Sequence, residues 1–113
     1  MNLNIVHLAG RLTREVELRS IPSGSQVANI GLAINRTWKD KSGEKHEDTT
    51  FVDCEAWEKT AEIMAKYLNK GSEVFVSGRL RLEQWDDKET GQKRSKLKVV
   101  VESFQFVGGK ADG

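Results

Sequence analysis

Four aromatic residues in strand-like segments are the first candidates for binding chemistry. Trp38 and Trp85 each end an alternating segment and open a long polar loop that contains a glycine. Phe51 and Trp57 share one parity of residues 49–57, while the other parity is small and apolar, so both rings are expected to face outward. An exposed aromatic ring can stack on the flat face of any nucleic-acid base. The set is therefore suited to a single-stranded nucleic acid.

Basic residues accompany these rings, as phosphate binding requires. Arg36 and Arg81 lie on the segments that end in a tryptophan, and Lys59 and Lys70 flank a segment with helical periodicity. Two simpler interpretations compete with this one. A single cation is more often a solvated surface charge, and a tryptophan at a strand end can also cover one end of a barrel. The interleaving of rings with cations favours the binding interpretation.

The elements that must position these side chains are mostly strands. Between them, Ala61, Met64 and Leu68 follow helical spacing, which predicts a helix of about ten residues with Thr60 as N-cap and Gly71 as C-terminal glycine. Period-two alternation predicts strands at 4–12 (continued after a bend at 15–21), 27–38, 49–57, 73–83 and 96–107.

This order predicts an all-β fold, namely a five-stranded OB-fold Greek-key barrel with one short α-helix between strands three and four. A five-stranded sandwich is the alternative architecture. Gly10 and Gly78 each interrupt a long strand, and we attribute them to the sharp coiling of a closing barrel. We expect one domain at residues 1–107 and a flexible C-terminal remnant at 108–113.

Side-chain alternation also predicts orientations in the strands on either side of the helix. In the strand before it, Asp53 and Glu55 share the outward parity of the two aromatics, where their charge should weaken phosphate binding. In the strand after it, Arg79 and Arg81 share the outward parity of Trp85. The expected core positions are then Val52, Cys54, Ala56, Val74, Val76, Leu80 and Leu82.

Length and composition exclude several classes of protein. The 113 residues suffice for one domain, and a single cysteine cannot form an internal disulfide, which fits a reducing compartment. No run approaches the roughly 20 apolar residues of a membrane span, and no secretory signal opens the chain, so we expect a cytoplasmic protein. The formal charge of +1 hides blocks of +3, −5 and +3 at residues 1–46, 47–62 and 63–113.

Catalytic and metal-binding patterns are absent from the sequence. His7 and His46 are the two histidines, and with one cysteine they cannot form a zinc-binding set. Neither a P-loop nor a G-x-S-x-G motif occurs. We therefore expect no enzyme activity, no metal and no cofactor.

A series of short motifs runs over residues 4–106. It comprises Val27-Ala-Asn-Ile30, Trp38-Lys-Asp40, Thr50-Phe-Val-Asp-Cys-Glu-Ala-Trp-Glu-Lys59, Ala61-Glu62, Tyr67-Leu68, Lys70-Gly-Ser72, Gly78-Arg-Leu-Arg81 and Trp85. In this order the series resembles the bacterial single-stranded DNA-binding protein family. The resemblance implies an OB-fold, a homotetramer and sequence-independent protection of single-stranded DNA in replication, recombination and repair, in the bacterial cytoplasm at the nucleoid.

The resemblance also implies individual roles. The family's base-stacking aromatics fall on Trp38, Phe51, Trp57 and Trp85, and its basic contacts fall on Arg19, Lys59, Lys70 and Arg81. Three features depart from the family pattern. Glu15-Val16 stands where relatives often have Asp-Pro, Asp53 and Glu55 stand where some relatives carry a basic residue, and the chain ends at Gly113 without an acidic tail. We therefore expect a DNA-binding core and do not carry over recruitment of partner proteins by such a tail.

Two alternatives share the predicted fold. A protein-interaction module related to primosomal replication protein B would be equally short, but it has no need for four outward aromatics among basic residues. An RNA or tRNA binder is not distinguished from a DNA binder, because stacking hardly senses the 2′-hydroxyl group.

Overall fold

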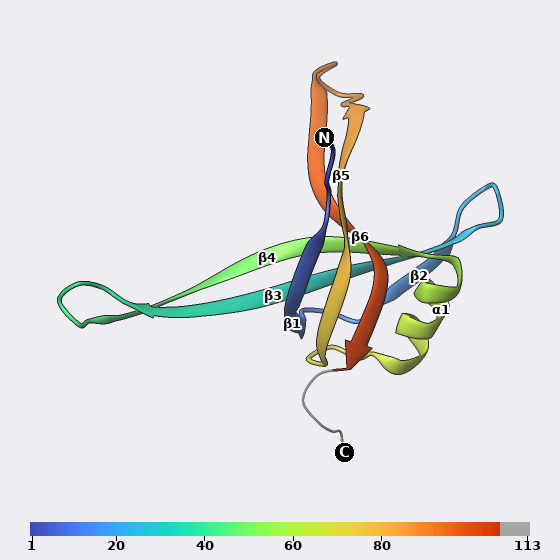
Figure 1. Cartoon of the computed structure of the whole chain (residues 1–113). Helices are drawn as coiled ribbons and strands as arrows, with labels where there is room; N and C mark the ends of the chain where they lie inside the picture. The colour runs from blue at the N-terminus through green and yellow to red at the C-terminus, as the bar shows by residue number, and fades with distance from the viewer. Residues whose placement is uncertain (107–113) are drawn as a thin grey trace.

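A computed structural model describes residues 1–106, which form six strands and one helix (Figure 1). The C-terminal remnant expected at 108–113 lies outside the described residues. In chain order the elements are β1 (Val6–Leu12), β2 (Glu17–Ser20), β3 (Gln26–Lys39), β4 (Lys45–Trp57), α1 (Glu58–Tyr67), β5 (Glu73–Asp86) and β6 (Lys93–Phe106).

The strands form one sheet that closes on itself. The strand order is β1-β5-β6-β4-β3-β2, and Arg11 and Leu12 of β1 also pair with β3, which closes the barrel. The β4–β6 pair is parallel and the other pairs are antiparallel. Because β1 and β2 are the two parts of the first expected strand, five strands build the wall and α1 follows the third. The predicted OB-fold barrel is confirmed, and closure excludes the open sandwich.

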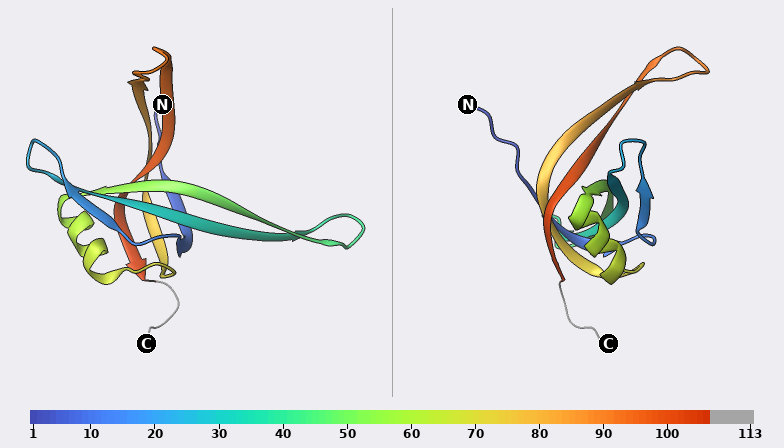
Figure 2. Two further views of the ribbon diagram at one scale, coloured as in Figure 1. Left: turned by 180° about the vertical axis from the view of Figure 1, so that it is seen from behind. Right: turned by 90° about the vertical axis from the view of Figure 1, so that its right-hand side faces the viewer.

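The core lies inside the barrel and under the helix. Its largest fully buried side chains are Ile30, Leu32, Met64, Leu68, Val27, Val74 and Val76. Figure 2 shows α1 packed against the barrel on the side away from the β3–β4 loop. Within residues 1–106, no helix is long and apolar enough to cross a membrane.

The helix has the predicted length but neither of the predicted caps. It begins at Glu58, directly after β4, so Trp57 occupies the N-cap position and Thr60 lies inside the first turn. Leu68 takes the C-cap position. Gly71 lies beyond it in a turn with φ of +91°, where its N–H donates a 2.8 Å hydrogen bond to the carbonyl of Leu12. The glycine therefore serves the loop that joins the helix to the barrel.

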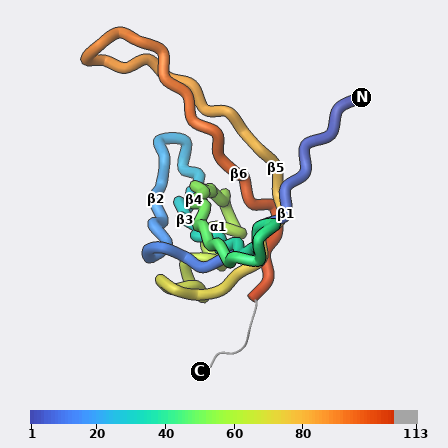
Figure 3. Tube along the Cα trace, turned by 90° about the vertical axis from the view of Figure 1, so that its left-hand side faces the viewer, coloured from blue at the N-terminus to red at the C-terminus, as the bar shows by residue number. Residues whose placement is uncertain are grey.

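Two hairpins extend beyond the barrel and are called the β3–β4 arm and the β5–β6 arm (Figure 1). Figure 3 looks along the β3–β4 arm and shows the β5–β6 arm leaving the barrel in another direction. Leu80 and Leu82, expected in the core, are exposed on the β5–β6 arm. The prediction was wrong because alternation indicates the face of a strand, whereas the barrel wall ends near Gly78.

Gly78 lies where the chain has no room for a side chain. A Cβ atom there would stand 1.8 Å from the carbonyl oxygen of Val100, beside a register shift in the β5–β6 pairing. We expect Gly78→Ala to lower the free energy of unfolding by about 1–3 kcal/mol or more, because the backbone of β6 must move. Denaturant unfolding measures the change. Gln84→Ala, an exposed position of the same strand, is the control, and equal midpoints for the two variants would contradict the close approach.

Candidate nucleic-acid interface

The four predicted aromatics lie on the arms and on β4. Trp38 and Trp85 are near the ends of the β3–β4 and β5–β6 arms and are partly exposed. Neither covers an end of the barrel, so the structure excludes the lid interpretation for both. Phe51 is 72% exposed on β4. Trp57 is half-buried where β4 meets α1.

Trp38 has two close partners on its own arm. It lies opposite His46 in the β3–β4 register, and the two rings are stacked with centroids 4.4 Å apart and planes inclined by 19°. The guanidinium carbon of Arg36 is 5.4 Å from the indole centroid, within the range of a cation–π contact. Arg36 therefore lies beside the tryptophan that the sequence associated with it.

One face of the β5–β6 arm combines the other exposed indole with cations. The register places Arg81 and Trp85 opposite Lys98 and Arg94, and Lys96 lies between these two residues of β6. The predicted common parity of the arginines and Trp85 is thus confirmed. Lys98 was missed by the sequence reasoning, because only the strand register shows that it shares this face.

The face of β4 that carries Phe51 adjoins this basic face through ion pairs. Arg81 donates a 2.7 Å hydrogen bond from Nη1 to Oε1 of Glu55, and Nζ of Lys98 lies 3.7 Å from the other carboxylate oxygen. Glu55 is 3% exposed, so its expected outward exposure was wrong: the β5–β6 arm covers it. The two faces therefore form one continuous surface.

Asp53, the second acid of this face, is also paired. It contacts Nζ of Lys96, and Nη2 of Arg14, from the bend between β1 and β2, lies 3.5 Å from it. The hydrogen bond from Lys96 is the main reason why the pKa of Asp53 is lowered. Arg14 is a second cation that sequence reasoning missed, since nothing local links it to β4. Both acids are thus paired with cations of this surface.

The paired groups surround an open depression between the β1–β2 bend and the β5–β6 arm. It has a volume of about 150 Å³ and is lined by Arg14, Glu17, Asn29, Asp53, Cys54, Lys96 and Lys98. Cys54 itself is buried, as predicted, and burial raises the pKa of its thiol to about 12. A thiol in this state is a poor nucleophile.

Asp53→Asn tests whether this acid limits phosphate binding. We expect the variant to bind oligo(dT) more tightly at low salt, because Lys96 and Arg14 lose their carboxylate partner. The dependence of log K on log salt should steepen by about 0.7 for each cation that then neutralises a phosphate. Salt titrations of binding measure this slope. Glu62→Gln removes the same charge from the helix as a control, and an unchanged slope in Asp53→Asn would contradict the expectation.

The remaining predicted contacts lie on the barrel. Lys59 follows Trp57 in the first turn of α1. Arg19 is exposed on β2, and Lys70 follows the helix, where its backbone N–H donates a 3.2 Å hydrogen bond to Oε2 of Glu15. Neither Arg19 nor Lys70 is on an arm. Arg36 and Arg81 therefore lie closer to the exposed aromatic rings than Arg19 and Lys70 do.

Similarity to known proteins covers almost the whole chain. The model of the "Single-strand binding protein family" matches residues 3–107. The single-stranded DNA-binding protein of Wolinella succinogenes is 50% identical over 95% of this chain and 65% of its own length. The single-stranded DNA-binding protein of Helicobacter pylori is 46% identical over 96% of this chain and 60% of its own length. The chain therefore spans less than two-thirds of the length of these relatives.

Solved structures show the same likeness. A deletion mutant of the single-stranded DNA binding protein from Thermus aquaticus superposes with a TM-score of 0.83 at 31% identity, over 96% of this chain and 52% of that chain. A complex of Plasmodium falciparum SSB with ssDNA superposes with a TM-score of 0.84 at 25% identity, over 96% and 97% of the two chains.

Proposed function

Because this chain belongs to the single-strand binding protein family, we propose that it binds single-stranded DNA without sequence preference. The observation that carries the proposal is the continuous surface on which Phe51 and Trp85 lie among paired cations, with Trp38 on the neighbouring arm. The Plasmodium relative, whose chain is matched over 97% of its length, was solved in complex with ssDNA. We further propose that binding protects unwound strands in replication, recombination and repair.

We propose that the aromatic rings stack on bases and that the basic side chains contact phosphates. Each base stacked on Trp38, Phe51, Trp57 or Trp85 contributes roughly 1–3 kcal/mol without regard to its identity. Arg36 and Arg81 lie within reach of the rings, and Arg19, Lys59 and Lys70 extend the cationic surface over the barrel. Trp38 and Phe51 have opposite parity in the β3–β4 register. The two rings therefore lie on opposite faces of the arm, and a DNA strand that stacks on both rings must wrap around the arm from one face to the other.

A titration of the intrinsic tryptophan fluorescence with oligo(dT), repeated at several salt concentrations, tests the function. We expect quenching, and binding that weakens as salt rises. Duplex DNA and oligo(U) serve as competitors. Absence of quenching by oligo(dT), or tighter binding of duplex, would overturn the proposal. Tighter binding of oligo(U) would instead identify an RNA binder on the same fold.

We propose that the chain forms a homotetramer through the leucine face, defined as Leu80, Leu82 and Leu97 on the side of the β5–β6 arm opposite its cations. All three are exposed, although Leu82 and Leu97 pair directly in the register. An apolar face flanked by charged residues is typical of an interface. The nearby Asn4 bonds both backbone groups of Leu80 at 2.8 Å, which fixes the chain before β1 along the arm.

Because single-stranded DNA arises where the chromosome is copied and repaired, we propose that the protein acts in the bacterial cytoplasm, associated with the nucleoid. We propose neither a catalytic activity nor a resident cofactor.

A further inference from the structure

We propose that His46 is a positioning residue for Trp38: its imidazole covers one face of the indole and leaves the other face for a base. This inference rests on the proposed binding of single-stranded DNA. His46 belongs neither to the motif series nor to the predicted stacking residues.

The ring stack is set by the strand register. Trp38 and His46 are direct partners in the antiparallel β3–β4 pairing, so their side chains emerge on the same face of the arm. The centroid distance of 4.4 Å and the small angle between the planes describe a stacked pair in contact. A base cannot occupy the covered face at the same time. The stack that forms on binding is therefore imidazole, indole and base.

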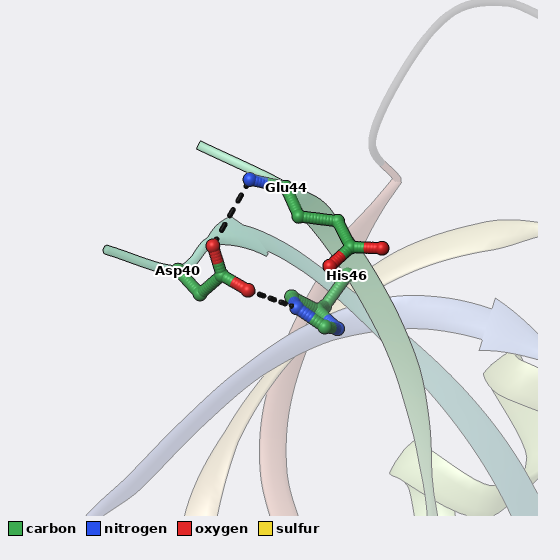
Figure 4. Close-up of side chains that lie close together, drawn as sticks. All are labelled: Asp40, Glu44 and His46. Atoms are coloured by element: carbon green, nitrogen blue, oxygen red, sulfur yellow. Dashed lines mark hydrogen bonds and ion pairs between the residues drawn. The ribbon is translucent and has the colours of Figure 1, made fainter. Parts of the chain in front are cut away.

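Asp40 holds the imidazole in this position (Figure 4). Nε2 of His46 donates a 2.8 Å hydrogen bond to Oδ2 of Asp40. Oδ1 accepts hydrogen bonds from the backbone N–H of Ser42 at 2.9 Å, the hydroxyl of Ser42 at 2.6 Å and the backbone N–H of Glu44 at 3.0 Å. One carboxylate thus ties the loop of the hairpin to the ring that supports Trp38.

These bonds keep Asp40 anionic over the working pH range. The hydrogen bond from the hydroxyl of Ser42, followed by that from His46, lowers the pKa of Asp40 from 3.8 to about 2. A permanent anion at Oδ2 is a suitable acceptor for the imidazole N–H. Arg36 and Asp48, which are register partners, lie on the same face of the arm as the imidazole.

The benefit for binding is preorganisation. An indole free to change rotamer on a solvent-exposed arm must be immobilised when a base stacks on it, which costs affinity. Holding the ring beforehand is expected to strengthen binding by roughly 2–12-fold.

Asp40, Glu44 and His46 also bring three potential metal-ligating atoms within 4.8 Å of one another. The hydrogen bonds of Asp40 account for this arrangement without an ion, because both carboxylate oxygens already have partners within the loop. We therefore assign the cluster to the support of Trp38. Adding EDTA to the binding assay separates the two explanations: the support predicts no change in affinity, and a loss with EDTA would overturn it.

The test is a double-mutant cycle on oligo(dT) binding, read by the anisotropy of a labelled oligonucleotide. We expect His46→Ala to weaken binding by roughly 2–12-fold in the wild-type background and to have no effect in the Trp38→Ala background. His46→Phe keeps an aromatic ring against the indole, so it should restore affinity. Thr37→Ala, on the opposite face of the same arm, is the control.

Two results of this cycle would overturn the proposal. One is wild-type affinity in His46→Ala, and the other is an equal loss in both backgrounds. Failure of His46→Phe to restore binding counts against the stack even if His46→Ala is weaker. These outcomes differ from a failure of the proposed function, in which the wild-type chain itself would not bind oligo(dT).

Discussion

Phe51→Ala is expected to weaken binding of oligo(dT) by about 1–3 kcal/mol, or roughly 5–150-fold, without lowering stability. The physical reason is that Phe51 is 72% exposed, so its ring contributes little to the core. Its β4 face adjoins the cations Arg81 and Lys96 through Glu55 and Asp53, so a stacked base would have phosphate partners close by. Truncation of the half-buried Trp57 to alanine would change both DNA affinity and protein stability, so the two effects could not be separated.

Anisotropy titrations and denaturant unfolding of the same samples measure the two effects separately. Phe51→Leu retains an apolar side chain of similar size but has no π-system, so it distinguishes stacking from simple burial. Tyr67→Ala removes an exposed aromatic at the end of α1 and serves as the matched control. If Phe51→Ala bound as tightly as the wild type, or if Phe51→Leu fully preserved affinity, base stacking at this position would be ruled out.

The second large effect is expected at the leucine face. Leu82→Asp together with Leu97→Asp should convert the proposed tetramer to smaller species. Leu82 and Leu97 are 53% and 58% exposed in the single chain, and burial of each leucine contributes about 1.5–3 kcal/mol. The two new carboxylates would lie directly opposite each other. Formation of the interface would bury both charges without a cationic partner, which is energetically costly.

Sedimentation velocity at several protein concentrations measures the assembly. Leu18→Asp introduces the same charge at an exposed leucine of β2 and should leave the mass unchanged. Intrinsic fluorescence confirms that the double variant remains folded. A wild-type chain that sediments as a monomer, or a double variant with the wild-type mass, would refute assembly through this face.

Local periodicity in β4 predicts the direction of each side chain but not what covers it. Val52, Cys54 and Ala56 point inward as the alternation indicated, because side-chain direction in a strand depends only on the parity of the residue. Glu55 has the predicted parity and is nevertheless buried, because Arg81 and Lys98 from another hairpin lie over it. Parity determines the face of the strand, and a distant segment determines what covers that face.

The start of α1 was also not predictable from local residue preferences. Thr60 has a residue type that caps helices well, but β4 continues to Trp57 and α1 begins at the next residue. The position of the first turn is therefore set by the end of a strand that pairs with β3, and not by the local preference of a threonine. Glu58 accordingly adopts a φ of +53° at this junction.

The amino-acid sequence by itself determined the all-β class, the order of the elements, the four aromatic candidates and the family, since these depend on local periodicity and on the order of motifs. Tertiary structure alone decided where the barrel ends, which cations meet which acids, and that His46 stacks on Trp38. The reason is that a strand register joins residues far apart in the chain. Pairings such as Arg14 with Asp53 thus depend on closure of the barrel, which no single segment encodes.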